Sequence, residues 1–166
     1  MDKIEIIGSK IFDRDQLLKQ CAIWRFKDRK IVFTNGCFDI LHLGHIEYLL
    51  KAAQLGNELI IGLNSDSSVR TLKGIHRPIN DERSRAMIMA SLSFVSAVVI
   101  FDEDTPYELI SQLKPDFLVK GDDYKTTEIA GHDIVLASGG QVVTIPLTPG
   151  YSTSAIEQKI LHLHTK

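Results

Sequence analysis

The sequence predicts an α/β fold in which helices cover both faces of a parallel sheet. Short apolar runs rich in β-branched residues alternate with longer segments of helical periodicity, the pattern of strand–helix–strand crossover units. The runs are apolar throughout, so both faces of each strand should be buried. These observations favour a Rossmann-like, three-layer α/β/α arrangement with a five-stranded parallel sheet. The expected strands cover residues 31–33, 59–63, 97–101, 117–119 and 142–145.

Helices are predicted where apolar residues recur at helical spacing between the strands. Some of their first residues carry clear signals. Thr105 and Pro106 supply an N-cap residue and an N1 proline, and the hydroxyls of residues 152–154 can cap the last helix. The expected helices cover residues 13–26, 45–55, 66–72, 81–92, 106–113, 127–138 and 153–163.

The 166 residues are expected to form a single domain, because this length buries a complete sheet-and-helix core. Residues 1–28 are polar and amphipathic, which predicts an N-terminal helical extension packed outside the sheet, and residues 29–166 would form the core. The outer face of this extension, with Ile23, Trp24 and Phe26, could contact a second copy or could simply pack on the sheet.

The composition excludes several classes of protein. Hydrophobic residues make up 44% and charged residues 24%, which excludes disorder, and a net charge of -2 gives no basic excess for a nucleic-acid partner. No apolar run approaches the roughly 20 residues that span a bilayer, so no membrane partner is expected. With only two cysteines, Cys21 and Cys37, and no signal peptide, the sequence predicts a cytoplasmic protein without disulfides.

The segment TNGCFDILHLGH, residues 34–45, directly follows the first expected core strand. Gly36 allows the backbone to approach a phosphate closely, and the N-terminus of the next helix offers free N–H groups and a positive dipole end. His42 and His45 are three residues apart and share a face if the turn is helical. Two histidines beside an anion site can donate to a leaving pyrophosphate, so the segment predicts nucleotidyl transfer.

Simpler interpretations of this segment remain open. The histidines could be capping residues or half of a metal site, although no third ligand lies nearby and no metal site is predicted. Cys37 could act as a nucleophile, but its apolar neighbours favour a packing role. Asp39 could face the substrate, although orienting the loop is the favoured role.

Further polar residues follow the other strands. Asn64 ends the second strand and faces the ribose or an anion, unless its neighbours only cap a helix. A basic segment follows that carries Lys73 and Arg77, with Arg83 and Arg85 on the next helix. Lys73 and Arg85 could close over a triphosphate, or these cations could simply lie on a solvated face.

Two more groups complete the candidate site. Lys120, Gly121, Asp122 and Asp123 follow a short strand, where a glycine permits close approach and carboxylates accept sugar hydroxyls. An exposed acidic turn is the alternative. The hydroxyls of residues 152–154 open the last helix and suit phosphate oxygens as well as a plain N-cap.

Three motifs together are similar to those of the cytidylyltransferase-like nucleotidyltransferase superfamily: Gly36-x-Phe38-Asp39, His42-Leu43-Gly44-His45 and Ser152-Thr153-Ser154. The likeness extends over about residues 30 to 163. Within the superfamily, the chain most resembles the heptose 1-phosphate adenylyltransferases of lipopolysaccharide biosynthesis. The similar segments are residues 33–42, 64–66, 72–74, 77–80, 103–106 and 119–124.

The resemblance implies a role for each matching residue. His42, His45, Lys73 and Arg85 would be catalytic. The acceptor substrate would be bound by Asp39, Arg77, Lys120 and Asp123. ATP would be bound by Thr34, Asn35, Gly36, Cys37, Phe38, Gly44, Asn64, Gly121, Asp122, Tyr151, Ser152 and Thr153.

The implied reaction is the transfer of AMP from ATP to D-glycero-D-manno-heptose 1-phosphate, giving ADP-heptose and pyrophosphate, with Mg²⁺ carried by the nucleotide. Glycerol-3-phosphate cytidylyltransferase is the first alternative. The motif of those enzymes is Gly-Thr-Phe-Asp, whereas this chain has Cys37 in place of the threonine. They also carry an arginine where this chain has Leu147. A nucleotide-binding domain without turnover is the second alternative. The nucleobase and the α or β anomer of the sugar stay open.

The resemblance also implies partners. In many such proteins the domain is fused to a sugar kinase, so this chain is expected to be the free-standing form, supplied with phosphorylated heptose by a separate kinase. A homodimer is expected because dimers are common in the family.

Overall fold

The computed structural model describes residues 2–164 and contains a parallel sheet of six strands in the order β1-β4-β3-β2-β5-β6. Five strands lie where the sequence predicts them, although most extend one to three residues further. Residues 31–36 pair in parallel with residues 58–63 along β2 and β3, the centre of the sheet. The strands are β1 (Ile11–Phe12), β2 (Ile31–Gly36), β3 (Glu58–Asn64), β4 (Ala97–Phe101), β5 (Phe117–Gly121) and β6 (Gln141–Ile145).

The additional strand corrects the expectation of a five-stranded sheet. In β1, Ile11 and Phe12 pair in parallel with Val98 and Val99 at the edge of the sheet. Two residues are too few to show any periodicity, so the sequence pattern contained no signal for this strand. Part of the segment 1–28 therefore belongs to the sheet itself, and the helix that follows packs on the sheet.

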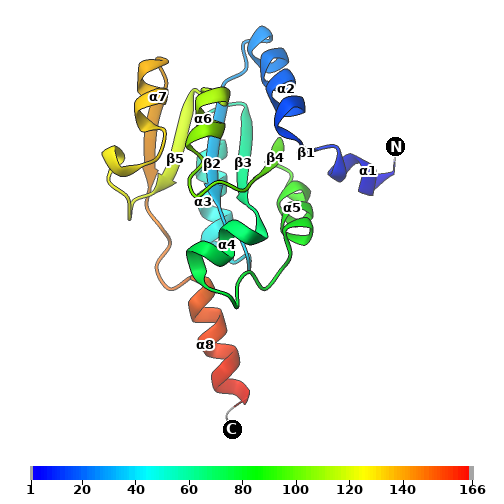
Figure 1. Ribbon diagram of the computed structural model, residues 1–166, viewed down its shortest axis with the longest axis vertical. Coiled ribbons are helices and arrows are strands. Elements are labelled where there is room, and N and C mark those ends of the chain that lie inside the picture. The colour runs from blue at the N-terminus through cyan, green and yellow to red at the C-terminus, as the bar shows by residue number, and fades with distance from the viewer. Residues whose placement is uncertain (1, 165–166) are drawn as a thin grey trace.

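Helices cover both faces of the sheet, as the apolar strands predicted (Figure 1). They lie close to the expected ranges, apart from a short first helix and a divided seventh. The helices are α1 (Lys3–Gly8), α2 (Arg14–Phe26), α3 (Leu43–Ala53), α4 (Asp66–Lys73), α5 (Glu82–Ser91), α6 (Tyr107–Leu113), α7 (His132–Ala137) and α8 (Thr153–His164), with a 3₁₀ turn η1 (Thr126–Glu128).

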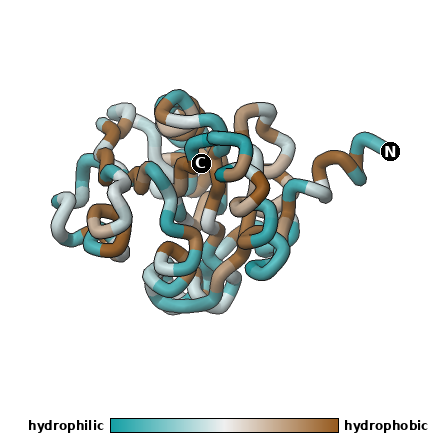
Figure 2. The backbone as a smooth tube through the Cα atoms, turned by 90° about the horizontal axis from the view of Figure 1, so that it is seen from above, coloured by the Kyte–Doolittle hydropathy of each residue, from teal (hydrophilic) through white to brown (hydrophobic). Residues whose placement is uncertain are grey.

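Alternate residues of the central strands point into two separate apolar cores. Ile31 and Phe33 of β2 lie in the core formed with α2, α6 and α7, whereas Val32 lies in the core formed with α3 and α5. Viewed from above, the apolar segments gather in the middle of the molecule, while α1 projects away from it (Figure 2). No helix among residues 2–164 is long and apolar enough to cross a membrane.

The expected continuous helix over 127–138 is wrong. Residues 126–128 form the 3₁₀ turn, and α7 begins only at His132, after Gly131. Gly131 has a φ of +83°, and a Cβ atom there would lie 2.7 Å from Ile110. This left-handed backbone packed against α6 interrupts the helix, and only glycine adopts it without strain.

The parallel strands bring their carboxyl ends to one edge of the sheet, from which α8 projects (Figure 1). Chain segments from 35–45, 102–106, 120–128 and 147–154 follow β2, β4, β5 and β6 and meet at this edge. The fold therefore concentrates the predicted motifs in one place, although they are far apart in the sequence.

Candidate active site

A cavity of about 670 Å³ opens at this edge of the sheet. It lies beside β2, where the strand order reverses, and open parallel sheets bind ligands at that position. The residues predicted from the sequence that line it are Asn35, Gly36, Cys37, Phe38, Asp39, His42, Gly44, His45, Asn64, Lys73, Arg77, Lys120, Gly121, Asp123, Tyr151, Ser152 and Thr153.

The two histidine rings stack at the start of α3, with centroids 3.7 Å apart and planes 19° from parallel. His42 is the N-cap residue, and its Nδ1 accepts the backbone N–H of His45 at 3.3 Å. This contact assigns the proton of the neutral His42 ring to Nε2, which is then available to donate to a ligand.

Both histidines favour the neutral form. Burial, followed by the neighbouring His42, lowers the pKa of His45 to about 4, and burial lowers the pKa of His42. The edge of Phe38 faces His45 at 5.3 Å. Nδ1 of His45 is buried and has no hydrogen-bond partner among residues 2–164. A backbone hydrogen bond to Ile40 acts in the opposite direction on the pKa of His45. In the neutral pair, Nε2–H of His42 is free to donate, and an incoming anion would favour protonation of both rings.

The N-termini of α3 and α8 lie next to each other. A Cβ atom at Gly44 would lie 3.1 Å from the Cβ of Tyr151, so a larger residue at position 44 would crowd this approach. The Thr148 hydroxyl donates to Glu47 of α3 at 2.5 Å and holds the two segments together. Ser152 accepts the Ala155 N–H at 3.0 Å through its hydroxyl oxygen, which leaves the hydroxyl proton free to donate. Free N–H groups at two adjacent helix ends suit phosphate oxygens.

Three cationic side chains line the cavity: Lys73, Arg77 and Lys120. The Lys120 ammonium donates to the Asn35 carbonyl at 3.3 Å and lies 5.5 Å from the centre of the Tyr124 ring. Burial lowers the pKa of Lys120 to about 8. Lys73 ends α4 and is exposed, as a residue that closes over a ligand should be.

Arg85 does not reach the cavity, which corrects its predicted role as a phosphate clamp. Its side chain is fully buried, and its guanidinium donates to the carbonyls of Asn80, Cys37 and Asn64 and to the Asp66 carboxylate. These bonds tie the loop after β2 to the end of β3. Arg85 is therefore a positioning residue for the site.

Asp39 also positions a loop instead of facing a substrate freely. Its carboxylate accepts the N–H groups of Ile79 and Asn80 and pairs with Arg77 at 2.9 Å. These bonds lower the pKa of Asp39 against the opposing effect of burial. Arg77 also pairs with Glu157 of α8 at 2.6 Å, so the segment after α4 is fastened to both the β2 loop and the last helix.

Two other predicted nucleotide-binding residues point elsewhere. Thr34 is fully buried, and its hydroxyl bonds to Tyr48 at 2.8 Å inside the fold. Asp122 lies outside the cavity, and its carboxylate accepts the Leu147 N–H at 3.3 Å. Asn64 lines the cavity, with its amide donating to Ser68 at 2.9 Å.

The cysteines bear on the nucleophile alternative. Burial raises the pKa of the Cys37 thiol, with Lys73, Arg85 and Lys120 acting weakly in the other direction. A thiol held in its protonated form is a poor nucleophile. Cys21, on α2, is fully buried, and burial raises its pKa to about 11. Packing is the role that the geometry favours for both.

Sequence reasoning missed the part of the cavity that lies between the β4–α6 loop and the segment after β5. Asp104, Thr105, Tyr124 and Glu128 line this part. The sequence did show polar residues after both strands, but without the sheet order nothing indicated that the two segments face each other.

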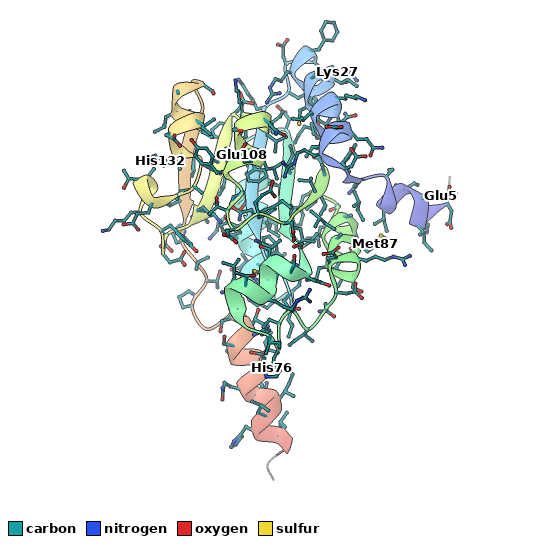
Figure 3. All side chains as sticks on the ribbon, viewed as in Figure 1. Glu5, Lys27, His76, Met87, Glu108 and His132 are labelled. Atoms are coloured by element: carbon teal, nitrogen blue, oxygen red, sulfur yellow. The ribbon has the colours of Figure 1, made fainter. Side chains whose placement is uncertain are left out.

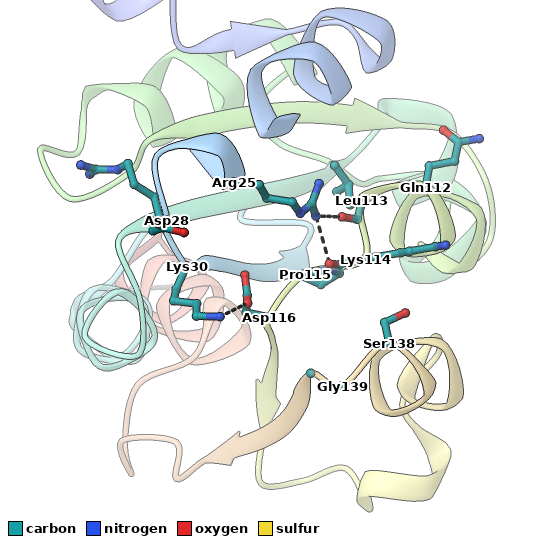
Figure 4. A pocket seen from close by; sticks show the side chains of 12 residues that line it. Arg25, Asp28, Lys30, Gln112, Leu113, Lys114, Pro115, Asp116, Ser138 and Gly139 are labelled. Carbon is teal, nitrogen blue, oxygen red and sulfur yellow. Dashed lines mark hydrogen bonds and ion pairs between the residues drawn. The ribbon is translucent and has the colours of Figure 1, made fainter. Parts of the chain in front are cut away.

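A second cavity, of about 540 Å³, lies at the opposite edge of the sheet, near the end where Figure 3 labels Lys27. In Figure 4, Arg25 points at the carbonyl oxygens of Leu113 and Lys114, and Lys30 pairs with Asp116 at 2.8 Å. These cations are engaged in holding chain segments together. No histidine is among the residues that line the second cavity, which distinguishes it from the first.

Neutral imidazole donors and helix N-termini around one cavity suit an anion whose charge grows during a displacement at phosphorus. The class of protein that this fold and site define is the α/β nucleotidyltransferases. The cytidylyltransferase-like family matches residues 33–159, and the chain belongs to that family.

The relatives include the bifunctional protein HldE of Wolinella succinogenes, which is 53% identical over 151 residues, 91% of this chain and 31% of the relative. The bifunctional protein HldE of Campylobacter jejuni subsp. doylei is 56% identical over 151 residues, again 91% of this chain and 31% of the relative. This chain therefore spans about a third of the length of these curated relatives.

Two solved structures resemble the fold. The lipopolysaccharide core biosynthesis protein of Thermoplasma volcanium gives a TM-score of 0.60 at 32% identity, covering 72% of this chain and 97% of that one. The pantoate-beta-alanine ligase of Francisella tularensis gives a TM-score of 0.59 at 18% identity, covering 94% and 79%, and it supports the fold alone.

Proposed function

We propose that this protein is an adenylyltransferase that transfers AMP from ATP to D-glycero-D-manno-heptose 1-phosphate. The observation that carries the proposal is the stacked, neutral His42–His45 pair at the junction of two helix N-termini, inside one cavity large enough for both substrates. The identity of over 50% to proteins named HldE supports the heptose acceptor over glycerol 3-phosphate.

The chemistry is a single in-line displacement. An oxygen of the sugar phosphate attacks the α-phosphorus of ATP, the bond from that phosphorus to the bridging oxygen breaks, and pyrophosphate leaves with the released electron pair. Negative charge grows on the leaving group during this step. Donors that strengthen with that charge lower the barrier, and they need no covalent intermediate.

Each side chain has a role that its position supports. His42 and His45 would donate to the α-phosphate and the leaving oxygen. The N-terminus of α8, with Ser152 and Thr153, would hold the β- and γ-phosphates. Lys73, at the end of α4, would close over them, while Lys120 would meet the phosphate of the acceptor.

Magnesium is expected to enter with the triphosphate. No cluster of three or more potential metal ligands occurs among residues 2–164. Mg²⁺ keeps most of its water ligands when phosphates bind it, so the nucleotide can hold it without a dedicated protein cage. When bound, it would offset part of the phosphate charge.

Three further proposals concern the setting. Free thiols at Cys21 and Cys37 support a reducing, cytoplasmic location. A sugar kinase must supply the phosphorylated heptose, and the exposed apolar side chains of the N-terminal segment, including Ile4 and Phe26, support a homodimer.

Pyrophosphate release tests the proposal. Purified protein with Mg²⁺ is assayed with ATP or CTP against heptose 1-phosphate or glycerol 3-phosphate. We expect release with ATP and heptose 1-phosphate. Release of pyrophosphate only with CTP and glycerol 3-phosphate would favour the cytidylyltransferase alternative. No release with any pair of substrates would favour a binding domain without turnover.

A further inference from the structure

The residues that line the cavity come from two sets of elements, and we call the two parts of the lining its wings. One wing lies at the N-termini of α3 and α8, with Gly44, Tyr151 and Ser152. The other, which we call the acidic wing, lies between the β4–α6 loop and the segment after β5, and it presents the side chains of Asp104, Thr105, Tyr124 and Glu128. Two wings of opposite character are suited to two different chemical groups.

The direction of the displacement assigns an occupant to each wing. Attacking and leaving oxygens lie roughly in line on opposite sides of the phosphorus. If pyrophosphate leaves toward the helix N-termini, the acceptor approaches from the acidic wing. Lys120 lies between the two wings, because its ammonium contacts the Asn35 carbonyl and the Tyr124 ring. An acceptor phosphate held at Lys120 would place the rest of that molecule in the acidic wing.

The groups of the acidic wing suit a molecule with many hydroxyls. Carboxylates accept hydrogen bonds from the hydroxyls of a polyol and repel a phosphate, and the hydroxyls of Thr105 and Tyr124 can donate to the same polyol. No hydrogen bond or ion pair within residues 2–164 engages the Asp104 carboxylate or the Thr105 hydroxyl, whereas the Glu128 carboxylate pairs with the exposed Lys125 at 3.6 Å. At the junction, Oδ1 of Asn35 is buried and lacks a donor, and it too would be satisfied by a hydroxyl of the ligand.

The loop that carries Asp104 is held in place from behind. Glu103 pairs with Arg14 of α2 at 2.5 Å, and the hydroxyls of Ser65 and Ser67 donate to Asp102. The backbone that carries Asp104 is therefore already ordered, and a bound sugar does not have to order the loop. Hydrogen bonds between Asp104 and the sugar can then contribute to selectivity.

We propose that the acidic wing is the sugar subsite, in which Asp104 and Glu128 accept acceptor hydroxyls and select a polyhydroxylated sugar phosphate over glycerol 3-phosphate. This inference rests on the proposed function for the direction of attack. Asp104 and Glu128 would be specificity-determining residues, and neither would take part in the displacement. Hydrogen bonds to charged groups are worth roughly a 10- to 100-fold change in affinity each.

Calorimetric titration of heptose 1-phosphate into protein saturated with α,β-methylene-ATP, which cannot be turned over, tests the subsite. Asp104→Asn and Glu128→Gln keep the size of each side chain and remove its charge. Glu108→Gln is the matched control, because Glu108 is exposed on α6 outside the cavity (Figure 3). The same titrations use glycerol 3-phosphate and the nucleotide analogue alone.

We expect each of the two variants to weaken heptose 1-phosphate binding about 10-fold or more, with unchanged affinity for glycerol 3-phosphate and for the analogue. The control should match the wild type. Weaker analogue binding would assign the wing to the nucleoside and overturn the inference, as would unchanged heptose 1-phosphate binding or its absence in the wild type. Binding that follows these expectations without pyrophosphate release would refute the proposed function alone.

Discussion

At the scale of single residues, the unusual property of His45 is its resistance to protonation. Burial and the adjacent His42 lower its pKa to about 4 from an ordinary 6.5. Because the folded-state pKa is depressed, the stability contributed by neutral His45 is complete above pH 6.5. It is lost progressively as the pH falls toward 4.

Nitrogen-15 NMR of the imidazole rings measures this directly. We expect His45 in the free protein to titrate near pH 4, and we expect ATP with Mg²⁺ to raise that value because a nearby anion favours the charged ring. A free-protein value near 6.5, or one that ATP leaves unchanged, would contradict the described environment of the pair.

Most of the residues around the cavity could be predicted from the sequence, because their chemical types and their positions after the expected strands can be recognised without the fold. It misplaced Arg85, whose cationic character suggested a phosphate. Only the fold reveals that four backbone and side-chain oxygens surround its guanidinium. Asp104 and Glu128 were missed because what they share is a facing position, which depends on the strand order.

Removing the Arg85 guanidinium should therefore loosen the site and the fold together. Arg85→Met leaves buried carbonyls without donors and Asp66 without its partner, so we expect a loss of about 3 kcal/mol or more in the free energy of unfolding. Arg83→Met is the control, since Arg83 is exposed on the same helix and should cost less than about 0.5 kcal/mol. Equal urea midpoints for the two variants would contradict the positioning role.

At the scale of elements, the break before α7 shows where sequence periodicity misleads. Residues 127–138 are compatible with one helix, yet Gly131 is held at positive φ against Ile110 of α6. Tertiary contact decides the local structure here. In the same way, the two-residue strand β1 forms because it pairs with the edge of β4. Two residues carry no recognisable sequence pattern, so this strand could not be predicted from the sequence.

Two glycine substitutions separate backbone strain from crowding at this break. Gly131→Ala and Gly139→Ala both place a side chain at positive φ, but only the first would meet a neighbour within 4 Å. We expect Gly139→Ala to cost about 1 kcal/mol and Gly131→Ala to cost at least about 1 kcal/mol more, measured by urea unfolding. Similar losses in both variants would mean that α6 yields to the added methyl group.

At the scale of the whole molecule, the fold class followed from the sequence because buried parallel strands and crossover helices leave a strong pattern. The sheet then brings loops that are as far apart in the chain as residues 35 and 152 around one cavity. The proposed sites for nucleotide and sugar lie in this cavity, beside β2, where the strand order reverses. That arrangement, and not any single motif, makes a transfer between two bound substrates possible.

The most direct test of the central claim is the rate at which ADP-heptose forms from ATP and heptose 1-phosphate, measured by mass spectrometry in the wild type and in His42→Ala and His45→Ala. We expect the wild type to form the product and each variant to be roughly 100-fold slower or worse, with the fold retained, because a transition-state donor is lost. Product formation at wild-type rates in both variants would contradict the account.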